Sequence, residues 1–363
     1  MFGKMNMSQM NWKKKTIIAI VLILLACAAA AVLYYHHLLN LINRPEETAA
    51  PTIQTVPETT VPVTTSPEET WPEITAEKNI TNILLVGQAA REGETALIAD
   101  SMILCSVNRE TNTLTLTSIM RDLRLVWPEF RDVDGNPHWG HNRVNMAYNM
   151  GYKWAGRNPL GGMKLLASII EHNFGVEVDH SIEINFDVFT QILEILDGVD
   201  LELSEAEVKY LQDNYPNSDT GKTLKPGINH LSPYLALGYA RMRKVGHGDY
   251  ERTERQRKII TLLIDKLRQK NILEILELFE TVLPGITTDM TNREITNYAF
   301  EFIPMLQNLN IQSQRIPFDG TFWNVTVEIE GQPVPDSQID CNVKENGRLL
   351  RQSIGMEPVE TEE

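Results

Sequence analysis

The sequence predicts an α/β fold, a layered domain in which helices cover both faces of a sheet. Over residues 79–356, apolar runs of strand length alternate with stretches whose apolar residues recur at helical spacing. This alternation is typical of a sheet enclosed by helices. No second linker and no internal repeat interrupts this body. We therefore expect one domain, flanked by segments of different character.

The N-terminal segment predicts a membrane anchor. Residues 16–35, TIIAIVLILLACAAAAVLYY, form an uncharged run of 20 residues, and a helix of this length spans roughly the 30 Å of a bilayer core. Lys13, Lys14 and Lys15 directly precede the run, so residues 1–15 should be cytoplasmic and the body extracellular. The alternatives are a cleaved signal peptide or a lipoprotein signal ending at Cys27, but the apolar run continues past Cys27. We expect a single-pass protein of the cell membrane.

Two further segments are expected outside the folded body. Residues 36–78 are assigned to a disordered stalk, because from Pro45 onward they are rich in Pro, Thr and Glu and lack apolar periodicity. Residues 357–363 form an acidic tail. The chain has a formal charge of −15, and residues 79–356 hold −10 of it. Because nucleic-acid-binding proteins usually spread positive charge over a face, this body argues against nucleic acid as a partner.

The first part of the body predicts strands. Residues 81–88, TNILLVGQ, indicate a buried strand, and residues 101–108 and 113–120 are apolar or alternating runs joined by a polar turn, which predicts a hairpin. Cys105 lies in this hairpin and Cys341 near the C-terminus. A disulfide between them and two isolated buried thiols both remain open, and the cysteines have no metal-binding spacing.

Helices and a further strand follow. Residues 161–175 have helical spacing and end at Gly175, residues 181–187 predict a strand, and residues 188–198 predict a helix that ends at Gly198. Another helix should begin at Ser232, the N-cap, with proline at its first position.

A basic stretch stands out in this acidic body. Residues 239–258, YARMRKVGHGDYERTERQRK, hold seven Lys or Arg and three acids. One helix should end near Arg241 and Arg243, and after two glycines a second helix carries Arg252 and Gln256 on one face. The apolar sequence that follows should anchor this helix in the core. Arginine suits phosphate because it donates bidentate hydrogen bonds in one plane. A solvated helix face is the plainer interpretation of the same charges.

A second group of charged residues lies at the predicted hairpin. Asp100 opens its first strand, and Arg121 and Asp122 follow its second. In a tight antiparallel hairpin these ends lie side by side, so Asp100 and Arg121 are expected to be neighbours. Arg143 and Asn145 stand before a short helix further on. A carboxylate for Mg²⁺ beside guanidinium groups for phosphate oxygens is typical of a metal-assisted phosphate site.

These segments together resemble the LytR-CpsA-Psr family of membrane-anchored enzymes. The resemblance covers about residues 80–270, and it rests on ADSMIL, SIMRD, HNRVNMAY, INFDVF, LDGVDLEL, ALGYARMR and GDYERTERQ in the family's order. It implies a three-layer α/β/α sandwich with a central mixed sheet and an apolar tunnel for a lipid. It also implies a phosphotransferase that moves a glycopolymer from a polyprenyl-pyrophosphate carrier onto a muramic-acid hydroxyl of peptidoglycan, forming a phosphodiester.

The resemblance also assigns roles to individual residues. It makes Asp100 the metal-binding carboxylate and implies a Mg²⁺ ion. Asp100 or Asp122 would take the proton of the attacking hydroxyl, and with Arg121 they are the expected catalytic residues. The expected pyrophosphate-binding residues are Arg121, Arg143, Arg241, Arg243, Arg252 and Gln256, and Asp249 belongs to the same motif as the last two.

Three positions depart from the family's usual pattern. Gln88 stands at or near the place of a second metal-binding aspartate, and its uncharged amide is a weaker ligand. Met120 stands where proline is usual, and Ala99 where a small polar residue is usual. Two other functions therefore stay open: a polyprenyl-pyrophosphate hydrolase and a non-catalytic lipid-carrier binding protein. A role in transcription does not fit the expected orientation of the body.

Overall fold

The computed structural model describes residues 31, 33–45, 73–88, 98–216, 223–246, 248–328 and 335–356. Most of the predicted anchor and stalk, and all of the acidic tail, lie outside the described residues, so those predictions stay predictions. In the described part of the chain, no helix is both long enough and apolar enough to cross a membrane.

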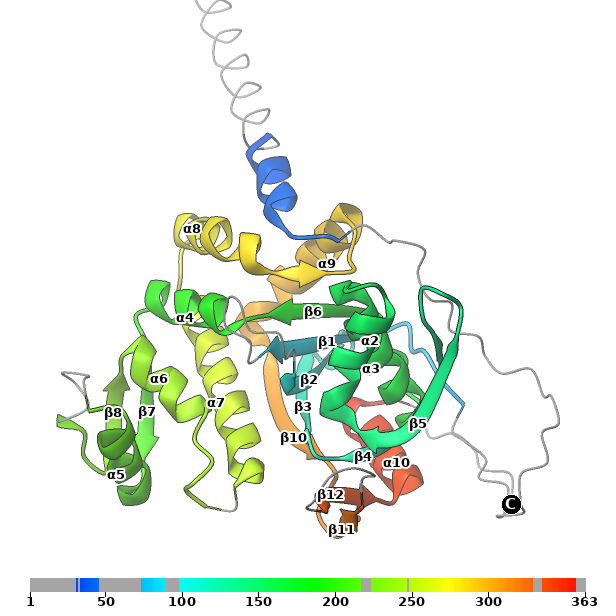
Figure 1. Ribbon diagram of the computed structural model, residues 1–363. Coiled ribbons are helices and arrows are strands. Elements are labelled where there is room, and N and C mark those ends of the chain that lie inside the picture. The colour runs from blue at the N-terminus through cyan, green and yellow to red at the C-terminus, as the bar shows by residue number, and fades with distance from the viewer. Residues whose placement is uncertain are drawn as a thin grey trace, which may run out of the picture.

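A mixed sheet forms the centre of the fold (Figure 1). Its strands are β1 Ile80–Gln88, β2 Ala99–Asn108, β3 Thr113–Ile119, β6 His180–Ile184, β9 Thr287–Thr288 and β10 Asn310–Ile316. Their spatial order is β10-β3-β2-β1-β6-β9. β2 pairs antiparallel with both β1 and β3, whereas β6 and β10 pair parallel with β1 and β3. The strand over residues 81–88 and the hairpin that follows it are therefore confirmed.

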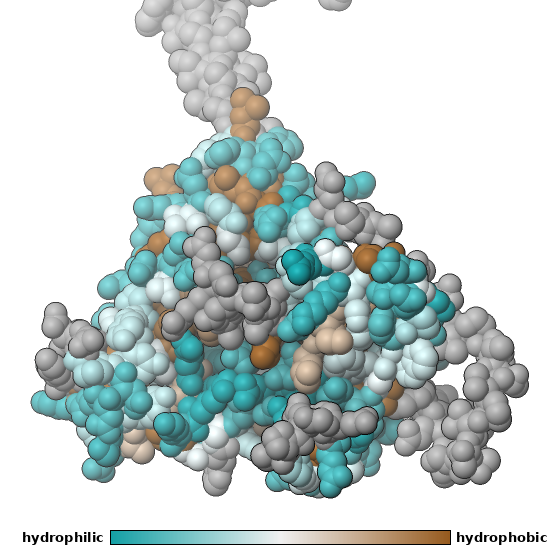
Figure 2. Space-filling view, viewed as in Figure 1, coloured by the Kyte–Doolittle hydropathy of each residue, from teal (hydrophilic) through white to brown (hydrophobic). Residues whose placement is uncertain are grey.

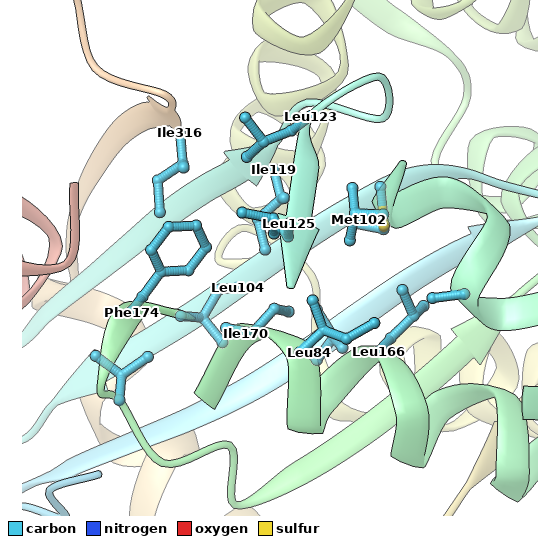
Figure 3. Packing of buried hydrophobic residues seen from close by; sticks show 14 of the residues in the cluster. Leu84, Met102, Leu104, Ile119, Leu123, Leu125, Leu166, Ile170, Phe174 and Ile316 are labelled. Carbon is cyan, nitrogen blue, oxygen red and sulfur yellow. The ribbon is translucent and has the colours of Figure 1, made fainter. Parts of the chain in front are cut away.

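Helices pack on both faces of this sheet. The helices are α2 Ala147–Trp154, α3 Pro159–Phe174, α7 Asp249–Leu267, α9 Asn292–Met305 and α10 Val343–Ile354. Leu84 and Leu104 face a core that α3 and α10 complete with Phe174 and other side chains (Figure 3). Ile103 and Leu116 face the opposite way, toward α7 and α9. Successive strand residues point to opposite faces, so burial on both sides explains why these runs are continuously apolar.

A smaller core lies beside the sheet. It is built by α4 Phe186–Ile195, β7 Val199–Leu203, α5 Glu205–Asn214, β8 Gly227–Leu231 and α6 Pro233–Ala240. Helix α7 contributes to both cores, because Ile259 and Leu263 pack into the smaller one while Ile260 and Ile264 pack against the sheet. The predicted anchoring of this helix by its apolar half is confirmed.

The remaining elements complete the edges of the fold. They are β4 Arg124–Arg131, β5 Pro137–Arg143, η2 Val144–Met146, α8 Ile272–Val282, η4 Leu283–Gly285, η5 Leu306–Asn308, β11 Phe322–Val327 and β12 Asp336–Cys341. Two predicted helix boundaries are confirmed: α3 ends at Gly175, whose φ is 66°, and α6 follows the N-cap Ser232. Cys105 and Cys341 are free thiols, and burial raises the pKa of each to about 12.

The segment before the stalk packs on the body. Residues 33–41 form a helix, and Leu38, Leu39 and Ile42, spaced for one helix face, are buried. The backbone of Asn43 exchanges hydrogen bonds with the β9 region, its N–H donating to the Ile286 carbonyl at 3.0 Å. The sequence assigns residues 36–45 to the stalk, and the structure instead places Asn43 and Arg44 against β9 and the residues that flank it. Figure 2 shows apolar side chains near this end of the molecule and hydrophilic ones over much of the rest of the visible face.

Candidate active site

The predicted hairpin contact forms the base of the site. Asp100 is the second residue of β2, and Arg121 lies two residues past the end of β3. Antiparallel pairing with Ile103 opposite Ser118 brings these two ends together. Arg121 Nη1 lies 2.9 Å from Asp100 Oδ1. The expectation that Asp100 and Arg121 are neighbours is therefore confirmed.

Two arginines from the basic stretch join this pair. Arg243 Nη2 lies 3.3 Å from Asp100 Oδ1, and Arg252 Nη2 donates to the backbone oxygen of Asp100 at 3.0 Å. Only 2% of the Arg252 side chain is exposed. The start of α7 carries Arg252, so the packing of that helix sets where the guanidinium sits. Segments more than 100 residues apart thus converge on one carboxylate.

A second carboxylate, Asp249, holds the same arginines from the other side. Arg252 Nη2 lies 2.8 Å from Asp249 Oδ1, and the Nε atoms of Arg121 and Arg243 lie 3.6 and 3.9 Å from it. We call Arg121, Arg243, Arg252, Asp100 and Asp249 the arginine cluster. The family resemblance includes Asp249 in a motif but implies no role for it. Its signal in the sequence is an acid directly after Gly248, at the first position of a helix rich in arginine.

The cluster has three guanidinium groups and two carboxylates, and Asp122, whose Oδ2 lies 3.5 Å from Arg121 Nε, adds a third carboxylate at its edge. Burial lowers the pKa of Arg252, although Asp249 and Asp100 act in the opposite direction. Burial would also lower the pKa of Arg121, but Asp122, Asp100 and Asp249 together raise it. Burial raises the pKa of Asp249 in spite of its arginine neighbours. Half-buried guanidinium groups in fixed positions can bind phosphate oxygens with little reorganisation.

Asp122 extends the cluster to Arg143. Asp122 Oδ2 lies 3.5 Å from Arg121 Nε, and its Oδ1 lies 3.3 Å from Arg143 Nη1. Arg143 ends β5 and also pairs with Asp336 at the start of β12. The sequence predicted Arg143 and Asp122 as site residues, and the structure brings both to the edge of the cluster. Asp336 was not foreseen, because no local pattern links it to this site.

Of the two remaining expected site residues, Gln256 lies beside the cluster and Arg241 lies apart from it. Gln256 lies one turn after Arg252 on α7, and its Oε1 accepts a hydrogen bond from Ser101 Oγ at 3.1 Å, directly beside Asp100. Arg241 is exposed, and its guanidinium carbon lies 4.6 Å from the centre of the Phe186 ring. Among the described residues, no ion pair links Arg241 to the cluster.

Gln88 lies next to the cluster at the end of β1. It pairs in register with Ala99, the residue before Asp100. Its side chain is 3% exposed, and its Nε2 is buried without a hydrogen-bond partner among the described residues. Within that part of the chain, no group of three or more His, Cys, Asp or Glu side chains could hold a metal ion. A Mg²⁺ ion at this place would have Asp100 as its carboxylate ligand, and phosphate oxygens and water would have to supply the others.

Comparison with known proteins identifies relatives of this chain. A family model described as the LytR_cpsA_psr family matches residues 40–338. The polyisoprenyl-teichoic acid–peptidoglycan teichoic acid transferase TagU of Halalkalibacterium halodurans is 29% identical over 211 residues, which are 58% of this chain and 60% of that protein. The chain thus matches less than two thirds of that relative's length.

Solved structures share the fold. Bacillus subtilis TagV superposes with a TM-score of 0.55 at 22% identity, covering 78% of this chain and 100% of that one. The Streptococcus agalactiae protein gbs0355 gives a TM-score of 0.60 at 19% identity, covering 78% and 90%. The mixed α/β architecture is therefore that of these proteins. The extent of the family match shows that this chain belongs to the LytR_cpsA_psr family.

Proposed function

We propose that this protein is a membrane-anchored phosphotransferase. It moves a glycopolymer from a polyprenyl-pyrophosphate carrier onto a peptidoglycan hydroxyl and forms a phosphodiester. The observation that carries the proposal is the arginine cluster, in which three guanidinium groups meet at the start of α7 and the end of β3. The name of the relative TagU, a teichoic acid–peptidoglycan transferase, supports the choice of donor and acceptor polymers.

The proposed reaction needs positioning and charge neutralisation more than covalent chemistry. Arg121, Arg243 and Arg252 bind the pyrophosphate oxygens and balance the charge that develops on them. The acceptor hydroxyl oxygen attacks the phosphorus that carries the polymer. The bond from this phosphorus to the bridging oxygen breaks, and polyprenyl phosphate leaves with that oxygen.

The hydroxyl proton passes to a carboxylate of the site. Asp100 and Asp122 are the acceptors expected from the sequence. Asp249 is a third candidate, because burial raises its pKa and a general base works best when its pKa lies near the working pH. Asp100 would also hold Mg²⁺, which, when bound, neutralises charge on the leaving phosphate.

A membrane location is part of the proposal. The uncharged run over residues 16–35 leads directly into the helix at residues 33–41, which packs on the body through Leu38 and Leu39. Exposed apolar side chains on α8 and α9, among them Leu273, Phe300 and Ile303, lie at the same end and support contact with a bilayer. Protease accessibility of the body on intact cells would test this orientation, and a body protected from external protease would contradict it.

The central test uses the full-length protein in detergent. It is mixed with a polyprenyl-pyrophosphate-linked glycopolymer, Mg²⁺ and peptidoglycan, with and without a chelator. Polymer covalently bound to peptidoglycan, formed by the wild type and not by Arg121→Ala, is the expected result. Arg348→Ala is the matched control, because Arg348 is an exposed arginine of α10 paired with Glu345.

Two other outcomes would point to the alternatives. Release of soluble polymer without attachment would mean a hydrolase. Binding of the lipid carrier without turnover would mean a carrier-binding protein. The uncharged amide of Gln88, which pairs with the residue before Asp100, favours this function if it stands where the family resemblance implies a second metal-binding aspartate.

A further inference from the structure

A pocket of about 550 Å³ lies beside the arginine cluster, and the mechanism above does not use it. It is lined by residues of α7, the end of β10 and the start of β11, among them Tyr250, Arg257, Arg315 and Phe322. Tyr250 directly follows Asp249 of the cluster. The backbone also joins the two places, because the N–H of Met120, before Arg121, donates at 3.0 Å to the carbonyl of Ile316, after Arg315.

Arg257 is the unusual group in this pocket. Its side chain is buried, with 5% exposed. Its Nε donates to Ser313 Oγ at 2.6 Å, but its Nη1 is buried without a partner, and no ion pair of Arg257 occurs among the described residues. Burial lowers its pKa to about 10, so it stays charged at neutral pH. Glu254, one turn earlier on α7, acts against the effect of burial on the Arg257 pKa but forms no ion pair with it in the described part of the chain. Buried cations are normally paired, and Arg257 therefore offers a site for one anionic group.

Another part of the pocket lining is aromatic. The guanidinium carbon of Arg315 lies 4.8 Å from the Tyr250 ring centre and 5.5 Å from the Phe322 ring centre. The two rings lie 5.6 Å apart at 32°. Arg315 is itself paired with Asp319, so its charge is already balanced. The wall is therefore a stack of flat groups suited to the face of a ring.

Acidic side chains in the pocket limit how many negative charges the ligand can carry. Glu251, Glu254 and Asp319 also line the pocket. Carboxylates accept hydrogen bonds from hydroxyl groups but repel a ligand with many negative charges. The volume falls in the range of roughly 300–1,000 Å³ that holds organic ligands, and a small inorganic anion would leave the aromatic wall unused.

We propose that this pocket binds a sugar that carries one carboxylate or phosphate, with the anion on Arg257 and the ring against Tyr250 and Phe322. The choice of source rests on the proposed function, in which muramic acid of the acceptor and an acidic glycopolymer of the donor both supply such a sugar. The position beside the cluster would hold one of the two polymers next to the reacting phosphate.

The experiment measures dissociation constants with the full-length protein in detergent, without lipid carrier. The probes are N-acetylglucosaminyl-N-acetylmuramic acid, the same disaccharide with its carboxyl amidated, a short teichoic acid fragment and acetate. The wild type should bind an anionic saccharide at least tenfold more tightly than the amidated disaccharide and than acetate. Arg257→Gln should remove this preference, and Phe322→Ala should weaken both disaccharides. Lys258→Gln, at the next and exposed position of α7, should change neither.

Arg257→Gln should keep the fold, because Arg257 forms no ion pair in the described part of the chain and its removal breaks none. The thermal midpoints of the variants and the wild type would check this. The proposal would be overturned if the wild type bound both disaccharides and the teichoic fragment with equal affinity. It would also be overturned if Arg257→Gln kept the preference, or if acetate bound as tightly as the saccharides. A preference for the disaccharide would show that the bound sugar belongs to the acceptor. A preference for the teichoic fragment would show that it belongs to the donor.

Kinetics separate this inference from the proposed function. If transfer occurs, Arg257→Gln should raise KM for the polymer that occupies the pocket and leave kcat nearly unchanged. Arg257-dependent binding without any transfer would support the pocket and overturn the transferase. Transfer without Arg257-dependent binding would support the transferase and overturn the pocket.

Discussion

Arg252 is the residue of the cluster whose removal should cost the most stability. Its side chain is 2% exposed, it contacts Asp249 Oδ1 at 2.8 Å, and it donates to the backbone oxygen of Asp100 at 3.0 Å. Arg252→Met keeps the apolar stem of the side chain and removes these contacts. Asp249 then loses its nearest cation, and the carbonyl of Asp100 loses a donor.

The expected loss is about 3 kcal/mol. Removing one partner of a buried ion pair typically costs about 3–5 kcal/mol, and no discount for solvent applies to a side chain this deeply buried. We expect a loss at the low end of this range because two other cations still face Asp249: the Nε atoms of Arg121 and Arg243 lie 3.6 and 3.9 Å from its Oδ1.

The loss should also depend on pH. Burial already raises the pKa of Asp249, and loss of Arg252 raises it further. An acid with a raised folded-state pKa loses stability as the pH rises from the unfolded pKa through the folded one. The difference between Arg252→Met and the wild type should therefore be largest at neutral pH and shrink as the pH falls toward the ordinary range of an aspartate.

A double-mutant cycle is the assay. Urea unfolding of the wild type, Arg252→Met, Asp249→Leu and the double variant gives the coupling between the two residues. Because an apolar pair of similar volume often replaces a buried ion pair without loss, the double variant should recover most of the stability. A loss below about 1 kcal/mol in Arg252→Met, or effects that simply add within ~0.5 kcal/mol, would refute this account of the cluster.

Four further predictions follow from the same structure. Arg121→Ala should lower transfer by roughly 10²–10³-fold while Arg348→Ala does not, and near-normal turnover would remove Arg121 from the site. Gln88→Asp should increase the rise in thermal midpoint caused by Mg²⁺, because it adds a carboxylate beside Asp100; Gln88→Asn is the control, and an equal rise in both would contradict the metal assignment. Asp249→Asn should abolish the fall of kcat/KM on the acid side of the pH profile if Asp249 accepts the proton, whereas an unchanged acid limb would leave that role to Asp100 or Asp122. Asp132 has its pKa lowered to about 2, chiefly by His138, so its stabilising contribution should be present above about pH 4 and fade as the pH falls toward 2; the wild type and Asp132→Asn should then differ in thermal midpoint at pH 7 and converge at pH 2.

The parts of the site that the sequence predicted are those set by local geometry. Asp100 and Arg121 belong to one hairpin, so pairing rules alone bring them together. Arg252 and Gln256 lie one turn apart on one helix, so they share a face. Strand and helix periods likewise predicted most elements of the sheet and the helices that cover it.

The parts that were missed depend on long-range packing. Arg241 and Arg243 are two residues apart just after α6, and such neighbours do not face the same way; Arg243 reaches Asp100, whereas Arg241 lies over Phe186. Asp336 reaches Arg143 through the pairing of β11 with β12, which no local pattern fixes. Residues 36–44 were placed in the stalk because they lie between the predicted anchor and the run rich in Pro, Thr and Glu. Leu38, Leu39 and Ile42 have helical spacing, but their burial needs a surface that only the folded body provides.

Helix α7 explains why the cluster can hold its geometry. Its apolar residues divide between two cores: Ile259 and Leu263 face the smaller one, and Ile260 and Ile264 face the sheet. A helix packed against two cores has little freedom to rotate or slide, because either motion would open cavities in a close-packed interior. Arg252, two turns earlier on the same helix, is therefore fixed relative to β2, which supplies Asp100. Such fixed donors lower a barrier without reorganising during the reaction, so the apolar half of α7 contributes to the chemistry of the site by positioning its polar half.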